Sequence, residues 1–185
     1  MAFARKSGAP RAFLNETGLY DYAVKALGRR MRTEAELRRL MHLRTEPGAH
    51  GDAIVAAVIK RLCERGYLND AAYAETYARL RQENEKLGER RVRNDLRRKG
   101  VRAELVEETV GARYSGANEE ALAREHLERK HIARPENEKE TARVVRRLAT
   151  AGFSTGIIYK ILREWEVPDE ALAALERLDD EPRQE

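Results

Sequence analysis

Apolar residues recur along most of this chain at spacings of three and four positions, and short breaks separate the runs. One such run consists of Ile54, Val55, Val58, Ile59 and Leu62, a spacing that predicts an amphipathic helix. The break that follows it is GYLND, residues 66–70. Gly66 tolerates the left-handed conformation that ends a helix, and Asn69 or Asp70 can cap the next one. We therefore predict that one helix ends and another begins within these five residues.

The apolar pattern repeats. A shift of 52 positions aligns the apolar residues of RRVRNDLRRKGVRAELVEETV, which begins at residue 90, with those of RVVRRLATAGFSTGIIYKILREW, which begins at residue 143. The matching pairs are Val92 and Val144, Leu96 and Leu148, Gly100 and Gly152, Val101 and Phe153, Leu105 and Ile157, Val106 and Ile158, and Val110 and Leu162. The first third of the chain fits less closely, through Leu37, Met41, Ile54, Val55 and Ile59, if the loop RTEPGAH carries about four extra residues. This pattern indicates a repeat array.

We expect an all-α fold of three tandem three-helix repeats that form an elongated, curved helical array. The expected divisions are a flexible basic tail over 1–17, repeats over 18–68, 69–114 and 115–166, and a short helix with an acidic tail over 167–185. The expected helix caps are Thr33, Asp52, Asn69, Asn118 and Ser154. Tyr73, Tyr77 and Trp165 are expected to pack in the core.

Charge is unevenly distributed along the 185 residues, 37% of which are charged, with a net charge of +4. Residues 1–44 and residues 78–102 each hold ten basic and four acidic residues, or +6, whereas residues 166–185 hold two basic and eight acidic residues, or −6. Such asymmetry suggests polyanions, or proteins bound to polyanions, as partners. A charged surface that serves only solubility is the alternative.

Several classes of function find no support in the sequence. Cys63 is the single cysteine, and its place beside Leu62 predicts a small buried hydrophobe. No apolar run is long enough for a membrane span and no signal-peptide core is present, so a soluble, cytoplasmic monomer is expected. His126 and His131 do not share a helical face, and the chain lacks a P-loop or nucleophile elbow. We expect no metal, no cofactor and no catalytic residue, and hence no enzyme.

The strongest surface feature is a stripe of arginines over residues 89–99. Arg90, Arg93 and Arg97 are spaced to share a face away from Val92 and Leu96, so we expect them to be exposed. Guanidinium groups suit phosphates and carboxylates, although a solvated face without a partner remains the alternative. Arg38 and Arg39 take the places of Arg93 and Asn94 in the first repeat, whereas Val145 and Ala149 replace Arg93 and Arg97 in the third. The basic face is therefore expected on the first two repeats.

Three ordered segments resemble the RecX family of bacterial regulatory proteins. They are RTEAELRRL, then VIKRLCERGYLNDAAYAETYARLR, then LGERRVRNDLRRKGV. The resemblance covers most of residues 19–165, is densest from Val58 to Val101, and departs in the longer loop around Pro47 to Gly51. It implies an all-helical array of three-helix repeats that binds the RecA recombinase. Family members limit growth of the RecA filament, and with it ATPase, strand exchange and coprotease activity in DNA repair and the SOS response.

The expected binding mode follows from the stripe and the resemblance together. Contact with the RecA–DNA filament is assigned to Arg38, Arg39, Arg90, Arg93, Arg97, Arg98 and Lys99, with Tyr159 and Trp165 as a possible secondary contact. Weak, non-specific contact with DNA is also expected. The alternative is a helix-turn-helix transcriptional regulator, because RRKGVRAEL places Gly100 at a turn between helices. The next segment, however, carries Glu104, Glu107 and Glu108, which would repel phosphates.

Overall fold

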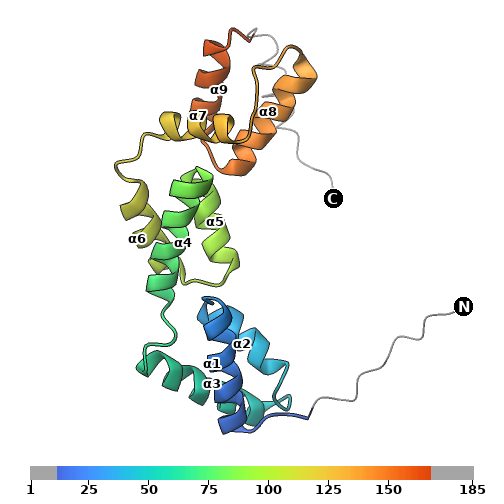
Figure 1. Cartoon of the computed structure of the whole chain (residues 1–185), viewed down its shortest axis with the longest axis vertical. Helices are drawn as coiled ribbons and strands as arrows, with labels where there is room; N and C mark the ends of the chain where they lie inside the picture. Colours follow the sequence, from blue (N-terminus) through green and yellow to red (C-terminus); the bar gives the residue numbers. More distant parts are fainter. Residues whose placement is uncertain (1–11, 168–185) are drawn as a thin grey trace, which may run out of the picture. The chain divides into compact units, whose positions relative to one another are not determined.

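The computed structural model describes residues 12–167, which form nine α-helices and no strand (Figure 1). The helices are α1 Glu16–Arg29, α2 Glu34–His42, α3 Ala49–Glu64, α4 Asp70–Glu85, α5 Glu89–Arg98, α6 Ala103–Tyr114, α7 Glu119–Arg129, α8 Glu138–Ala151 and α9 Thr155–Glu164. The all-α prediction is confirmed. The first eleven residues of the expected tail, and the expected closing helix after Val167, lie outside the described residues. Glu16 and Thr17, assigned to the tail, begin α1 instead.

The described residues divide into two compact units. The first contains the chain up to Tyr73 together with Lys99–Val101, and the second contains Ala74–Arg98 and the chain from Arg102 onward. The three repeat boundaries expected from the sequence therefore stay a prediction.

The core of the first unit lies between α1, α2 and α3, which pack against one another. Its buried side chains include Leu19, Leu37, Met41, Val55 and Leu62. Burial of aliphatic side chains of this size contributes about 1.5–3 kcal/mol each, so this shared core outweighs the intrinsic helix preference of any one segment.

The second unit has its main cluster between α7, α8 and α9, with α5 packed on both α6 and α8. Leu148, Phe153, Ile161 and Leu162 are almost completely buried there. Helix α8 thus has one side in this cluster and also contacts α5. That arrangement fixes the positions of the side chains on the remaining faces of both helices.

The apolar pairs related by the 52-residue shift occupy matching environments. At six positions the two members of a pair are buried to a similar degree. Five pairs are buried, namely Val92 and Val144, Leu96 and Leu148, Val101 and Phe153, Val106 and Ile158, and Val110 and Leu162. The sixth pair, Leu105 and Ile157, is half-buried. The first-repeat residues Ile54 and Val55 follow the same order, half-buried and then buried. Apolar spacing in the sequence therefore predicted which side chains face inward.

Two helix ends that are related by the repeat make the same kind of packing contact. In the first unit, the Thr33 hydroxyl donates to the Lys99 carbonyl at 2.6 Å, just before α2. In the second, the backbone N–H of Gly88 donates to the Ala151 carbonyl at 2.9 Å, just before α5. Thr33 and Gly88 occupy equivalent positions before their helices, as do Lys99 and Ala151 before the closing glycines.

Both closing glycines are left-handed and tightly surrounded. Gly100 has φ +82°, and a Cβ placed on it would lie 2.4 Å from the Ala35 Cβ. Gly152 has φ +96°, and a Cβ there would lie 2.3 Å from the backbone nitrogen of Arg91. Any other residue would be strained by its φ and would also collide with the neighbouring helix. The glycines serve both the turn and the close approach.

The GYLND prediction is confirmed. Gly66 is left-handed, with φ +72°, and Tyr67 and Leu68 both return backbone hydrogen bonds to the Leu62 carbonyl at the end of α3. Leu68 is buried, and the Asn69 side chain accepts a hydrogen bond from the Ala72 N–H at 3.0 Å. One helix ends and the next begins within five residues.

The other expected caps have mixed outcomes. Thr33 and Asn118 each accept a hydrogen bond from the N–H three residues on, as expected. Ser154 stands at the N-cap of α9, but its hydroxyl pairs with the Glu119 carboxylate rather than with its own helix. Asp52 is wrong as a cap, because α3 begins at Ala49 after Gly48, which leaves Asp52 inside the first turn.

Cys63 is exposed, so the prediction of a buried residue is wrong. The buried face of α3 holds Val55, Ile59 and Leu62, and each step along a helix rotates the side chain by about 100°. Cys63 is therefore turned away from the core. Partial burial, followed by the charges of Glu34 and Asp70, raises the pKa of its thiol, which disfavours the reactive thiolate.

Candidate functional site

The arginine stripe of α5 is less exposed and less charged than its spacing suggested. Arg90 and Arg97 are exposed, but only 24% of the Arg93 side chain is accessible. Arg93 pairs with Glu89 at 2.5 Å and, through Nε, lies 3.1 Å from the Glu107 carboxylate on α6. Arg97 donates to the same Glu107 carboxylate at 2.7 Å. Part of the stripe's charge is therefore neutralised by acids of the same unit.

A buried carboxylate, Asp95, organises the opposite side of α5. It receives hydrogen bonds from Arg91 Nε at 3.1 Å, from the Tyr77 hydroxyl at 3.2 Å, and from the Arg98 guanidinium. Burial acts to raise the pKa of Asp95, but the hydrogen bonds from Arg98 and Arg91 outweigh it and hold that pKa below its usual value. Tyr77, expected in the core, is half-buried because its hydroxyl serves this network.

The remaining predicted residues lie in the first unit. Lys99 Nζ is 3.2 Å from Glu36 and 5.8 Å from the centre of the Tyr73 ring. Arg38 pairs with Glu34 at 2.7 Å, one turn earlier on α2, and Arg39 is exposed. Because the other four arginines belong to the second unit, the predicted binding set is divided between the two units.

A basic groove in the second unit was missed by sequence reasoning. Its volume is about 670 Å³, and we call it the α8 groove. It is lined by Glu85, Leu87, Arg91, His126, Lys130, Ile132, Arg143, Arg146, Arg147, Thr150 and Ala151. Five of these side chains are cationic and one is a carboxylate, so the groove presents a concentrated positive field.

The α8 arginines differ from those of α5 in their pairing. Arg143, Arg146 and Arg147 are exposed, and within residues 12–167 none of them forms an ion pair. The repeat alignment does not reveal them, because two arginines of the α5 stripe correspond to positions 145 and 149, which are not arginine in α8. The available signal was the short segment RVVRR, residues 143–147, read on its own helix.

His126 forms part of the groove's inner surface. Its Nδ1 lies 3.1 Å from the Glu85 carbonyl oxygen, and its ring meets Phe153 edge-on at 5.7 Å between centroids. Burial, reinforced by the nearby charge of Lys130, lowers the pKa of His126. The neutral ring therefore serves packing, and within the described residues no group of three metal-binding side chains is present.

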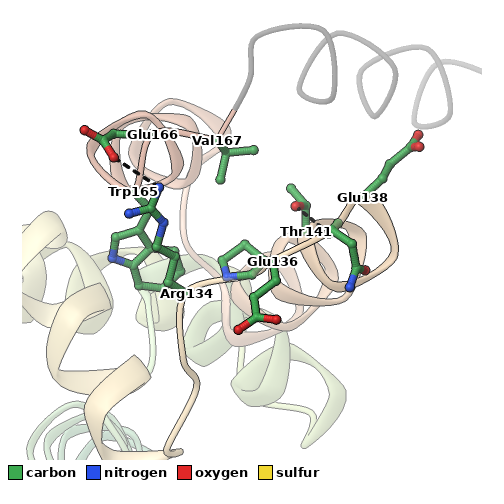
Figure 2. Close-up of a pocket in the computed structure, with 9 residues that line it drawn as sticks. Arg134, Glu136, Glu138, Thr141, Trp165, Glu166 and Val167 are labelled. Carbon is green, nitrogen blue, oxygen red and sulfur yellow. Dashed lines mark hydrogen bonds and ion pairs between the residues drawn. The ribbon is translucent and has the colours of Figure 1, made fainter.

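Tyr159 and Trp165, the expected secondary contact, are both half-buried and packed against the α7–α9 cluster. The expectation that Trp165 packs is confirmed. Trp165 also lines a separate pocket of about 480 Å³ near the start of α8, with Val167 and Thr141 (Figure 2). Arg134 and Glu166 form an ion pair at 3.2 Å in that pocket.

The segment that would read DNA in a helix-turn-helix protein is α6. Its Glu104, Glu107 and Glu108 are all exposed, and Glu107 is held by Arg93 and Arg97. An acidic helix of this kind repels the phosphates that flank the major groove. Across residues 12–167, no helix is long and apolar enough to cross a membrane.

Comparison with known proteins points to one family. The domain described as "RecX, second three-helix domain" matches residues 69–110. "Regulatory protein RecX" of Deinococcus radiodurans is 38% identical over 148 residues, which cover 79% of this chain and 67% of that protein. "Regulatory protein RecX" of Thermobifida fusca is 33% identical over 166 residues, which cover 86% of each chain.

Solved structures agree at the level of the fold. The "Crystal structure of RecX from Lactobacillus salivarius" superposes with a TM-score of 0.60 at 22% identity, covering 82% of this chain and 96% of that one. A second structure, "Crystal structure of regulatory protein RecX", has a TM-score of 0.62 at 23% identity and covers 80% and 71%. With its ordered motifs, its helical repeats and relatives matched over most of their length, this chain belongs to the RecX family of regulatory proteins.

Proposed function

We propose that this protein acts in the bacterial cytoplasm as a non-enzymatic regulator that binds filaments of the RecA recombinase on DNA and limits their extension. Lower ATPase, strand-exchange and coprotease activity would follow. The observation that carries the proposal is the relationship to regulatory proteins named RecX over 86% of the chain. The resemblance of the same segments to that family supplies RecA as the partner.

The surface chemistry supports a polyanionic or acidic partner. Arg90 and Arg97 on α5, and Arg39 on α2, are exposed guanidinium groups, which make paired hydrogen bonds to phosphates and carboxylates. Arg93 is assigned a supporting role, because its two acidic partners already hold it. Arg38, Arg98 and Lys99 complete the proposed contact set, with Tyr159 and Trp165 as a second contact.

The test is the DNA-dependent ATPase of RecA. The wild-type protein should inhibit ATP hydrolysis at substoichiometric ratios, because blocking one growing end stops the addition of many subunits. Reversal of two exposed α5 charges, Arg90→Glu with Arg97→Glu, should weaken inhibition and its salt dependence. A matched control reverses Lys25 and Arg29, exposed bases of α1. Equal inhibition by the α5 variant and the control would refute the α5 contact.

The same protein also tests the transcriptional alternative. A duplex-reading regulator should retard one DNA fragment selectively in the presence of competitor DNA, whereas a filament regulator should bind fragments weakly and without preference. A selective shift without any effect on the RecA ATPase would overturn the proposed function. Exposed acids on α6 lead us to expect no selective shift.

A further inference from the structure

The α8 groove holds a positive charge that the described part of the chain does not balance. Of its charged side chains, Arg91 is engaged by Asp95, and Glu85 is engaged by Arg81. Four cationic side chains are left without an ion-pair partner among residues 12–167, namely Lys130, Arg143, Arg146 and Arg147. Unbalanced charge along one groove favours an anionic occupant.

The uncharged lining indicates what kind of anion fits. Leu87, Ile132 and Ala151 contribute apolar surface beside the arginines. Sites for single-stranded nucleic acid usually add aromatic side chains on which bases stack, and the lining contains no Phe, Tyr or Trp. A peptide with both carboxylates and aliphatic side chains matches this groove better than a nucleic-acid strand.

The chain itself carries such a peptide directly after the last described residue. Residues 168–185, PDEALAALERLDDEPRQE, contain seven acidic and two basic residues, or −5, together with three leucines. We call these eighteen residues the C-terminal segment. Their charge is opposite to that of the groove, and their leucines match its apolar lining.

The C-terminal segment can also reach the groove. It follows Val167, which is buried in the same hydrophobic cluster as Ala151, a residue of the groove lining. Eighteen residues span up to about 60 Å when extended. A tethered segment of this length has an effective concentration on the order of millimolar, so even weak complementary contacts are occupied.

We propose that the α8 groove is the binding site for the chain's own C-terminal segment, with its carboxylates on Lys130, Arg143, Arg146 and Arg147 and its leucines against Leu87 and Ile132. The segment thereby covers a basic surface that would otherwise attract polyanions. The proposal concerns these two parts of the chain alone and holds or fails independently of any effect on RecA.

A nitroxide near the chain end provides a direct test in the full-length protein. Gln184→Cys carries the label in a Cys63→Ser background, since Cys63 is exposed and would otherwise react as well. The label should broaden the NMR signals of backbone amides in residues 143–151 at low salt. In about 1 M NaCl, where the Debye length is roughly 3 Å, the broadening should largely disappear.

Charge variants identify the groove as the cause. Arg143→Glu, Arg146→Glu and Arg147→Glu together should abolish the broadening, as should Asp179→Asn, Asp180→Asn and Glu181→Gln together. The matched control reverses three exposed bases of the first unit, Lys25, Arg29 and Arg30, and should retain it. Two different sets of changes keep the test decisive if one variant fails to fold.

Other occupants would give different results. Broadening that persists in the α8 triple variant, or that appears on α5 instead of α8, would overturn the proposal, as would its absence from the wild-type protein at low salt. A mixture of labelled unenriched chains with unlabelled isotope-enriched chains should show no broadening. Broadening in that mixture would mean that the segment binds a second copy, and the intramolecular site would be wrong.

Discussion

Helices α5 and α8 are built on one pattern yet carry their charges in opposite ways. Val92 and Leu96 on α5 are buried as Val144 and Leu148 are on α8, and both helices end at a left-handed glycine. At the position where α5 buries Asp95, however, α8 carries the exposed Arg147. The apolar face is the repeated element, whereas the charged face is particular to each helix.

The difference shows that the number of arginines on a helix does not give its effective charge. Arg93 and Arg97 share an acid from α6, and Asp95 holds two further arginines. An exposed pair such as Arg97 with Glu107 contributes only about 0–1 kcal/mol to stability, whereas the pairs of the buried Asp95 contribute more; both kinds neutralise charge toward a partner. On α8 no such acids are provided by the described residues, and the arginines face a groove.

The largest effect is expected where α8 ends against α5. In Gly152→Ala, the new Cβ would collide with the Arg91 backbone nitrogen and the residue would have to keep φ +96°. We expect a loss of about 3 kcal/mol in the free energy of unfolding, measured by urea denaturation. Gly66→Ala is the matched control, because a Cβ there meets no atom within 4 Å. Its cost should be about 1 kcal/mol, and equal losses for the two variants would disprove the close approach.

A smaller loss of stability is expected when Asp95 is replaced, the buried acid of α5 that has no counterpart on α8. Asp95→Asn removes the charge that Arg91 and Arg98 share, so we expect a loss of about 2 kcal/mol at pH 7. The pKa of Asp95 is lower in the folded protein than in the unfolded chain. The contribution of Asp95 to the free energy of unfolding is therefore present above its unfolded pKa and is lost as pH falls through its folded pKa. The difference between wild type and variant should therefore shrink in acid. A difference that is constant from pH 7 to pH 2 would contradict this account.

Charge reversal of a single arginine should destabilise the protein more when the arginine lies on α5 than when it lies on α8. Arg93→Glu places a third carboxylate beside those of Glu89 and Glu107, and we expect a loss of about 1 kcal/mol in the free energy of unfolding. Arg146→Glu changes a side chain without a partner acid among the described residues, and its effect should stay within about 0.5 kcal/mol. Thermal melts of the two variants at one salt concentration measure both. Equal melting temperatures would show that the Glu107 pairs on α5 contribute nothing.

The smallest effect concerns His126 in the groove. Because burial lowers its folded pKa below the ordinary value of 6.5, the unfolded chain takes up the proton first as pH falls. The free energy of unfolding should thus decrease from about pH 6.5 downward until the folded pKa is passed. His126→Asn, which keeps an amide donor near the Glu85 carbonyl, should flatten this part of the profile. An unchanged profile would assign the pH dependence to other groups.

Much of the fold could be predicted because apolar spacing and helix-ending residues are local signals. The burial of Val106 and Ile158, the left-handed Gly66 and the caps at Thr33 and Asn118 all follow from neighbours within a few positions. Asp52 failed for a local reason too, since Gly48 permits an earlier start to α3. Cys63 failed because one position along a helix decides between the core and the surface.

The candidate site was harder to predict because it depends on contacts distant in sequence. Glu107 reaches Arg97 across a turn, and the groove joins Arg91 to Arg147 of α8 and to Lys130, which directly follows α7. No periodicity within one helix records which acid of another helix will meet an arginine. The sequence motifs were enough to predict the family, whereas the pairing of charges between helices could be seen only in the three-dimensional structure.

The hydrogen bond from Thr33 to Lys99 has a consequence for the order in which the chain acquires structure during synthesis. Chains emerge from the ribosome N-terminus first, and early segments can fold as they appear. The first unit, however, includes Lys99–Val101, and the Lys99 carbonyl that accepts the hydrogen bond from Thr33 lies sixty-six residues further along the chain. Helices α1 to α3 are thus synthesised before their last partner is translated, and a pause in elongation before codon 99 would prolong the interval in which that end of α2 lacks its partner.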